Sequence, residues 1–283
     1  MRREPVIRRF GHGRLHLQDG PIDLIIEAFG EAPAIDRAYE AAAARFIAIL
    51  DELCEELPLL RSAAGTPPRG VVARRMWEAV LPFAQDTFIT PMAAVAGSVA
   101  EEVLGAMTAA ADLRRAYVNN GGDIAVALAS GETLRIGMVD RPDRPSMFGS
   151  LFLSADQPVR GIATSGWRGR SFSLGIADAV TVLADTAAMA DAAATIIANA
   201  VDLPGHAAIE RRAATELAPQ NDLGERLVTV AVGALTTTEI DRALAQGCRA
   251  AEACLERRLI HAAALHLGGT TRQVEGVLQI QAA

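Results

Sequence analysis

After its first residue, Thr186, the apolar stretch from 186 to 201 is interrupted by three polar residues at intervals of four: Asp191, Thr195 and Asn199. Ala, Ile and Met fill most of the other positions, which predicts a buried helix. On a helix this spacing places the three polar side chains on one face. A carboxylate and a hydroxyl one turn apart can both bind a hard cation such as Mg²⁺, which prefers oxygen ligands. Asp191 and Thr195 are therefore the candidate metal ligands.

A structural interpretation of the same residues is also open. Asp191 would then cap a loop amide, and Thr195 would bond to its own backbone. Asp185 and Thr186 already supply N-cap chemistry before this helix, so a second capping residue is less needed. Because an unpaired buried carboxylate is strongly destabilising or loses its charge, both interpretations require a partner for Asp191.

Two other stretches have residue types suited to a phosphate group. NNGGD, at 119–123, joins two predicted strands, and its Gly pair can turn backbone N–H groups toward an anion. GIATSG, at 161–166, ends a strand in hydroxyls and Gly, and Trp167, Arg168 and Arg170 follow it. An ordinary turn and a solvated loop are the alternatives. The candidate cofactor-binding residues are Asn120, Gly121, Gly122, Asp123, Thr164, Ser165 and Gly166.

Composition excludes several classes of protein. The net charge of −7 argues against a nucleic-acid binder, so any phosphate ligand needs a local site. The three cysteines form no CxxC pair and have no His at zinc-like spacing, which fits plain thiols in a reducing compartment. The five histidines build no catalytic triad, and there is no GxGxxG, Walker, HExxH or GxSxG motif.

We expect a soluble, cytoplasmic protein with no membrane partner. The N-terminal residues are basic, but no uninterrupted apolar run follows them, so they do not predict a signal peptide. No segment approaches the roughly 18 to 20 apolar residues that cross a bilayer. Long Ala-rich helices and few aromatic residues leave apolar faces that a second copy would cover, which predicts a homodimer.

The periodicity predicts one α+β domain over 1–283, with antiparallel sheets packed against long helices. Helices are expected over 33–57, 72–83, 91–107, 186–201 and 237–259, with a further helical stretch after Pro204. Strands are expected over 14–30 (a hairpin), 116–120, 123–129, 132–140, 150–154, 159–165, 179–184, 227–235 and 260–267. The strands at 150–154 and 159–165 are expected to pair with each other. The tail, 270–283, is expected to be poorly ordered.

The order of these segments resembles the FAD:protein FMN transferase superfamily, the ApbE-like proteins, over about residues 85 to 205. A small-residue helix start is followed by VNNGGDI, LRIGMVDRP, GIATSG and AVTVLADTAAMADAAAT. That family has a NLGGD-type turn, a WRVGIQDP-type strand, a GVATSG strand and a SVTVIA…ADALAT helix in the same order. Its Mg²⁺-binding Asp and Thr fall on Asp191 and Thr195. The resemblance implies an ApbE-like fold, Mg²⁺ and FAD, in a compact, uncharacterised branch of the superfamily.

The sequence departs from the family at two places that matter for catalysis. The family's His-x-x-Asp-Pro-x-Thr-Gly segment is replaced by WRGRSFSLGI, which has neither His nor Pro; Asp178 is a remnant of the Asp. The family's Ala-Lys-Gly becomes Val95-Ala96-Gly97, without the Lys. Asp178, Arg168 and Arg170 are the candidate catalytic residues.

Three functions are compatible with this pattern. The first is Mg²⁺-dependent cleavage of FAD with transfer of FMN to a hydroxyl acceptor. The second is a non-catalytic module that binds a flavin or another nucleotide. The third is an enzyme that acts on another phosphorylated or acidic metabolite in the same pocket.

Overall fold

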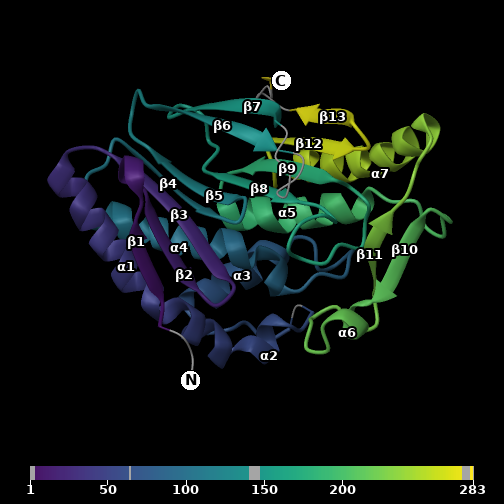
Figure 1. The fold of residues 1–283 in the computed structure, drawn as a ribbon, viewed down its shortest axis with the longest axis horizontal. Helices are drawn as coiled ribbons and strands as arrows, with labels where there is room; N and C mark the ends of the chain where they lie inside the picture. The colour runs from purple at the N-terminus through teal and green to yellow at the C-terminus, as the bar shows by residue number, and fades with distance from the viewer. Residues whose placement is uncertain (1–3, 64, 140–146, 276–280, 283) are drawn as a thin grey trace. The chain divides into compact units, whose positions relative to one another are not determined.

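The computed structural model, drawn in Figure 1, describes residues 4–63, 65–139, 147–275 and 281–282. The chain divides into two compact units. Unit 1 comprises Met1–Leu134, Leu153–Ala163 and Asp185–Asp191; unit 2 comprises Arg135–Phe152, Thr164–Ala184 and Ala192–Ala283. The boundary falls within strand β8 (Gly161–Ser165) and within helix α5 (Ala187–Ala200). The single domain expected from the sequence stays a prediction.

The sheet of unit 1 is antiparallel and has the order β1-β2-β3-β4-β5-β8. Its strands are β1 (Val6–Arg9), β2 (Leu15–Asp19), β3 (Ile22–Phe29), β4 (Arg115–Asn120), β5 (Asp123–Leu128) and the first part of β8. Buried and half-buried residues alternate along β3, as a strand with one face against the core requires. Gly20 makes the β2–β3 turn at a positive φ of 54°.

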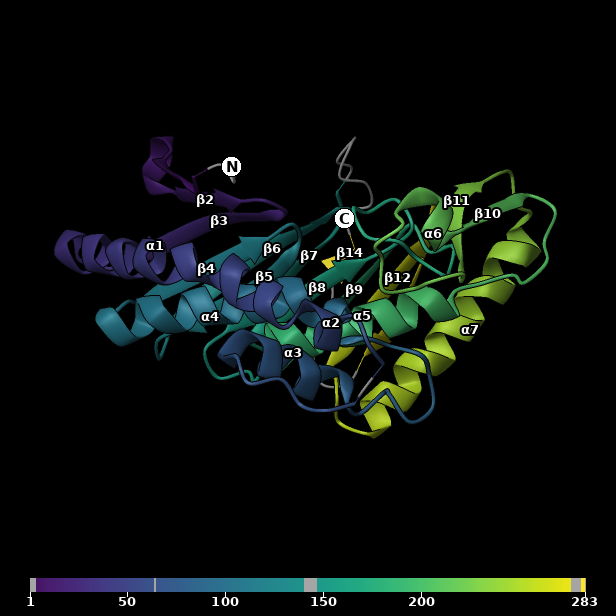
Figure 2. The ribbon, with the colours of Figure 1, turned by 90° about the horizontal axis from the view of Figure 1, so that it is seen from below.

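Helices of unit 1 cover one face of this sheet (Figure 2). They are α1 (Ala32–Glu55), α2 (Leu57–Leu60), α3 (Val71–Val80) and α4 (Val95–Ala110), which follows a 3₁₀ turn, η2 (Pro91–Ala94). Helix α1 packs against α4 with buried residues at helical spacing, including Ala42, Phe46, Ile49 and Leu53. Helix α4 in turn packs against β4 and β5.

One helical stretch corrects an expectation from the sequence. Pro91–Ala110 is long and apolar enough to cross a membrane by length and composition, although no such segment was expected. A buried core helix has the same composition, and α4 buries Val99, Ala100, Val103 and Met107 inside unit 1.

Unit 2 contains its own antiparallel pairs. Strand β12 (Ala262–Leu267) lies between β9 (Ala179–Ala184) and β13 (Thr270–Glu275), with α7 (Thr237–Glu256) packed on β12 and β13. Strands β10 (Ile209–Ala213) and β11 (Leu227–Val232) form a second pair, joined through α6 (Ala214–Leu217). Most of β6 (Thr133–Val139) and β7 (Met147–Ser154) lies here too, in the order β14-β7-β6 with β14 (Gln281–Ala282).

The α+β class is confirmed, but three local expectations differ from the structure. The strand at 150–154 is part of β7, which pairs with β14, while β8 pairs with β5; alternation identifies a strand but not its partner. The stretch after Pro204 gives strand β10 and only four helical residues in α6. The first six residues of the tail form β13, and 276–280 lie outside the described residues.

Candidate functional site

The beginnings of α4 and α5 lie in direct backbone contact within unit 1. A Cβ added to Gly97 would lie 2.2 Å from the carbonyl oxygen of Ala187. A Cβ added to Gly161 would lie 2.0 Å from the carbonyl carbon of Thr186. Both distances are far below van der Waals contact, so these two glycines allow the start of α5 to approach α4 and β8. Close packing therefore explains the glycine at position 97.

Each of these two helices supplies a carboxylate to the N-terminal end of the other. Asp191 Oδ2 accepts a hydrogen bond from the Gly97 N–H at 3.0 Å. Glu101 Oε1 accepts one from the Ala188 N–H at 2.7 Å. The first N–H groups of a helix have no partner inside the helix, and the positive end of the helix dipole favours a carboxylate there. Asp191 therefore does cap a backbone amide, and that amide belongs to another helix 94 residues earlier.

The end of β4 and the start of β5 contribute polar side chains to the same place. Asn120 Nδ2 donates a hydrogen bond to the carbonyl oxygen of Ala96 at 3.1 Å. This carbonyl belongs to the same peptide group as the Gly97 N–H that donates to Asp191. Asp123 lies opposite Asn120 in the antiparallel β4–β5 pair. Directly opposed residues project their side chains from the same face of a sheet, so Asp123 faces the beginning of α4 as Asn120 does.

The pKa of Asp191 is raised well above its ordinary value of 3.8. Burial is the largest cause, and the negative charge of Asp123 raises the pKa further. The N–H groups of Gly97 and Ala96 act in the opposite direction. Two carboxylates in a poorly solvated place are stabilised either by a proton on one of them or by a cation between them.

The other polar residues of the α5 stripe have different surroundings. Asn199 Oδ1 accepts the Leu174 N–H at 2.9 Å and so fixes the loop between β8 and β9 within unit 2. The Thr195 hydroxyl has no hydrogen-bond partner among the residues that the structure describes. The bond from Thr195 to its own backbone, considered above as the alternative, is therefore not formed, and this hydroxyl is available to a ligand.

The NNGGD turn has the backbone geometry that its glycines predict. Gly121 has a φ of 69° and Gly122 a φ of 117°, a region that other residues rarely adopt. The Gly122 N–H donates to Asn119 Oδ1 at 2.8 Å. One of the amides expected to face an anion is thus bonded within the turn, and Gly121 is exposed.

In unit 2, Asp178 holds together two segments of chain. Its Oδ1 accepts from Arg168 Nε at 2.8 Å and from Trp167 Nε1 at 3.2 Å, and its Oδ2 accepts from the Gly268 N–H at 2.8 Å. The Arg168 guanidinium lies 4.2 Å from the centre of the Trp167 ring. Because three donors occupy the Asp178 carboxylate, this geometry favours a structural role over that of a free base. Arg170 is exposed.

The GIATSG strand end is also partly explained by packing. Thr164 Oγ1 lies 2.9 Å from Thr181 Oγ1 on β9. A Cβ on Gly166 would lie 2.4 Å from the carbonyl oxygen of Asp178. Ser165 is half-buried. A role for these three residues in cofactor binding stays a prediction.

The structure adds limits on a metal site. Among the described residues, no group of three or more His, Cys, Asp or Glu side chains is placed to hold a metal ion. A cation at Asp191 would therefore need additional oxygen ligands, such as a hydroxyl, backbone carbonyls, water or substrate phosphate. Glu101 was not found from the sequence; its only signal was an acidic residue one turn after Gly97 in an apolar helix.

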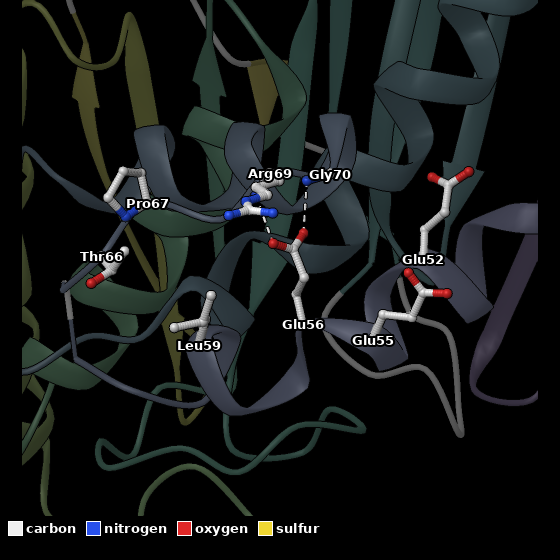
Figure 3. A pocket seen from close by; sticks show the side chains of 8 residues that line it. All are labelled: Glu52, Glu55, Glu56, Leu59, Thr66, Pro67, Arg69 and Gly70. Carbon is white, nitrogen blue, oxygen red and sulfur yellow. Dashed lines mark hydrogen bonds between the residues drawn. The ribbon is translucent and has the colours of Figure 1, made fainter.

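A cavity of about 530 Å³ lies elsewhere in unit 1, and Figure 3 shows its lining. Glu56 accepts hydrogen bonds there from the N–H groups of Arg69 (2.6 Å) and Gly70 (2.7 Å), the two residues that precede α3. The full lining consists of Glu52, Glu55, Glu56, Leu59, Thr66, Pro67, Arg69 and Gly70. None of these is a predicted site residue.

Comparison with known proteins relates the chain to one family. A family model described as AbpE bacteria matches residues 7–273. The UPF0280 protein of Methanopyrus kandleri is 37% identical over 140 residues, which are 50% of this chain and 52% of that protein. The UPF0280 protein of Methanosphaerula palustris is 42% identical over 114 residues, 40% of this chain and 47% of the relative. The chain thus spans about half the length of the curated relatives that it matches.

A solved structure is similar at a lower level. The Pseudomonas stutzeri flavinyl transferase ApbE in its apo form superimposes with a TM-score of 0.44 and 11% identity. The alignment covers 97% of this chain and 94% of that one. At these values the likeness has no weight for function.

Proposed function

The chain belongs to the AbpE bacteria family, and from this premise we propose that it binds a flavin nucleotide, FAD, together with a divalent cation, Mg²⁺. The proposed metal ligands are Asp191 and Thr195, with Asp123 as a further oxygen donor. The proposed flavin-binding residues are those of the NNGGD turn and of the GIATSG strand end.

The environment of Asp191 is the observation that carries this proposal. Burial and the charge of Asp123 both disfavour an ionised Asp191, as the raised pKa of Asp191 expresses. A divalent cation would compensate both charges, and carboxylate and hydroxyl oxygens are the donors that Mg²⁺ prefers. The Thr195 hydroxyl, one turn further along α5, has no other partner among the described residues. The residues present therefore fit such a cation.

When bound, the cation would neutralise charge on the pyrophosphate group of the nucleotide. The chain's own residues would fix the position of that group. The positive φ angles of Gly121 and Gly122 shape the turn, and the N–H groups at the start of α4 already hold the Asp191 carboxylate. An oriented carboxylate binds a cation with less loss of side-chain freedom than a mobile one.

A more specific proposal is that the protein also cleaves the bound FAD. The oxygen of an acceptor hydroxyl would bond to the phosphorus on the FMN side, the bond from that phosphorus to the AMP oxygen would break, and AMP would leave. The proton of the acceptor must pass to a base. Asp178 is the carboxylate nearest in sequence to the family's missing segment, and three donors already occupy it. Loss of a general base typically lowers a rate by about 10²- to 10⁴-fold.

The engagement of Asp178 favours a second candidate function, a flavin- or nucleotide-binding protein without turnover. Incubation with FAD and Mg²⁺, followed by chromatographic detection of AMP, separates the two. Release of AMP by wild type, but not by Asp191→Asn, supports the enzyme. Binding of FAD without AMP supports the binding protein. If the protein neither binds FAD nor releases AMP, the flavin assignment is refuted, and another phosphorylated or acidic metabolite remains as the candidate ligand. Asp112→Asn, at an exposed position in unit 1, is the matched control.

A further inference from the structure

We propose that Glu101 is a positioning residue for the metal site: by capping the first turn of α5 from α4, it holds Asp191 in place. This inference rests on the proposed function, because it assigns Asp191 to a cation. Glu101 itself would not touch the cation. It would act through the backbone of α5, in which Ala188 lies three residues before Asp191.

The first turn of α5 depends on Glu101 for its amides. Glu101 accepts the Ala188 N–H at 2.7 Å, and hydrogen bonds from Ala187 and Thr186 also reach its carboxylate. Thr186 Oγ1 accepts the next amide, that of Met189, at 3.2 Å. The local N-cap thus satisfies one amide, and the carboxylate from the other helix satisfies the two before it. Unsatisfied amides at a helix start let that turn fray.

Glu101 is itself held by a cation from a third helix. Arg75 on α3 forms an ion pair with Glu101, with its Nε 3.2 Å from Glu101 Oε2. The same guanidinium donates to the Ser98 carbonyl oxygen at 3.0 Å and pairs with Glu102 at 2.9 Å. The Glu101 side chain is 20% exposed. Burial raises the pKa of Glu101, while the α5 amides and Arg75 lower it. The orientation of this carboxylate is therefore set from α3 as well as from α5.

The two caps form a closed loop of covalent and hydrogen bonds. It runs from Gly97 to the Asp191 carboxylate, along α5 to Ala188, to the Glu101 carboxylate, and along α4 back to Gly97. Opening the loop at Glu101 leaves the start of α5 held to α4 by one carboxylate instead of two. The Asp191 side chain can then adopt more positions, which weakens the binding of any ligand that requires one particular position.

An ordinary stabilising ion pair is the alternative, and Glu102 is its matched control. Glu102 is the next residue on α4 and pairs with Arg45 at 2.7 Å and with Arg75 at 2.9 Å. Both of these arginines lie on other helices, Arg45 on α1 and Arg75 on α3, and neither lies on α5. Removing Glu102 disturbs the same helix and the same Arg75, but leaves both caps in place.

The first measurement is Mn²⁺ affinity of the full chain, by electron paramagnetic resonance of free Mn²⁺. Loss of a residue that orients a metal ligand typically weakens binding about 10- to 100-fold. We expect at least about 10-fold weaker binding for Glu101→Ala and for the shorter Glu101→Asp. Glu101→Gln keeps a side-chain oxygen acceptor, so we expect binding within about threefold of wild type, and Glu102→Ala should stay within about twofold.

The second measurement does not depend on metal. The Gly97 N–H donates a hydrogen bond to Asp191 Oδ2, so the hydrogen-exchange rate of this amide in metal-free protein reports how firmly Asp191 is held. We expect exchange at least about tenfold faster in Glu101→Asp and near the wild-type rate in Glu101→Gln and Glu102→Ala. Gly97 exchange at the wild-type rate in Glu101→Asp would overturn the inference, as would equal weakening of Mn²⁺ binding by Glu102→Ala. If wild type binds no Mn²⁺, the proposed metal site fails, while Gly97 exchange still decides whether Glu101 holds Asp191 in place.

Discussion

The Asp191 carboxylate on α5 lies 3.0 Å from the backbone nitrogen of Gly97 at the beginning of α4. This bond gives Asp191 a structural role without satisfying its charge, because the pKa of the group stays raised by burial and by Asp123. The same carboxylate can therefore cap a helix and bind a cation. The two interpretations that the sequence left open are compatible with each other.

The raised pKa of Asp191 predicts how stability depends on pH. The folded protein binds this proton more tightly than the unfolded chain, so in metal-free protein stability falls as pH rises above the ordinary value of 3.8 and through the raised pKa. Asp191→Asn removes this dependence. In urea unfolding between pH 5 and pH 8, the free energy of unfolding of the variant should increase relative to that of wild type as pH rises. A constant difference between the two proteins would contradict the raised pKa.

Gly97→Ala should be strongly destabilising, because its Cβ would lie 2.2 Å from the Ala187 carbonyl oxygen. Forcing α4 and α5 apart should cost about 1–3 kcal/mol or more. Gly105→Ala is the control in the same helix, because nothing lies within 4 Å of its added Cβ. That substitution should be neutral or stabilise by about 1 kcal/mol. Similar unfolding midpoints for the two variants would show that the close contact is not required.

The NNGGD turn should resist substitution for a conformational reason. Gly122 has a φ of 117°, yet no atom lies within 4 Å of an added Cβ. Gly122→Ala should therefore cost about 1 kcal/mol or more through backbone strain alone. Chemical denaturation measures this loss in the free energy of unfolding, with Gly105→Ala again as the reference. A variant as stable as wild type would remove the geometric reason for this glycine.

The oligomeric state expected from the sequence stays a prediction. Apolar faces of Ala-rich helices would be covered by a second copy, and twofold dimers are the commonest assemblies. Light scattering at micromolar concentration should give about twice the chain mass of 29.8 kDa. A particle of the chain mass would end this prediction.

Periodicity alone located most of the elements. The apolar run with three polar residues is α5, and the hairpin at 14–30 is β2 and β3. The helix expected over 237–259 is α7, which begins with a capping box of Thr236 and Glu239. The order of the NNGGD, GIATSG and ADAAAT segments identified the family, which the match over 7–273 confirms. These features are local, so a sequence can display them directly.

Local sequence patterns do not predict which residues far apart in the chain form hydrogen bonds with each other. Asp191 and Gly97 are 94 residues apart, and Glu101 and Ala188 are 87 apart. Nothing in either segment specifies the other, because a carboxylate can cap any helix that comes within reach. The same limit explains the wrong partner expected for the strand at 150–154. The three donors around Asp178 also come from segments that only the fold brings together.

Calorimetric titration of FAD into the full chain, once in Mg²⁺ and once in EDTA, measures directly whether flavin binding depends on the cation. Wild type should bind FAD in Mg²⁺ and lose at least about tenfold in affinity in EDTA. Asp191→Asn and Thr195→Ala should bind FAD weakly under both conditions, and Asp112→Asn should behave as wild type. Equal FAD affinity in Mg²⁺ and EDTA, or unchanged Mg²⁺-dependent binding by Asp191→Asn, would contradict cation-dependent flavin binding at Asp191.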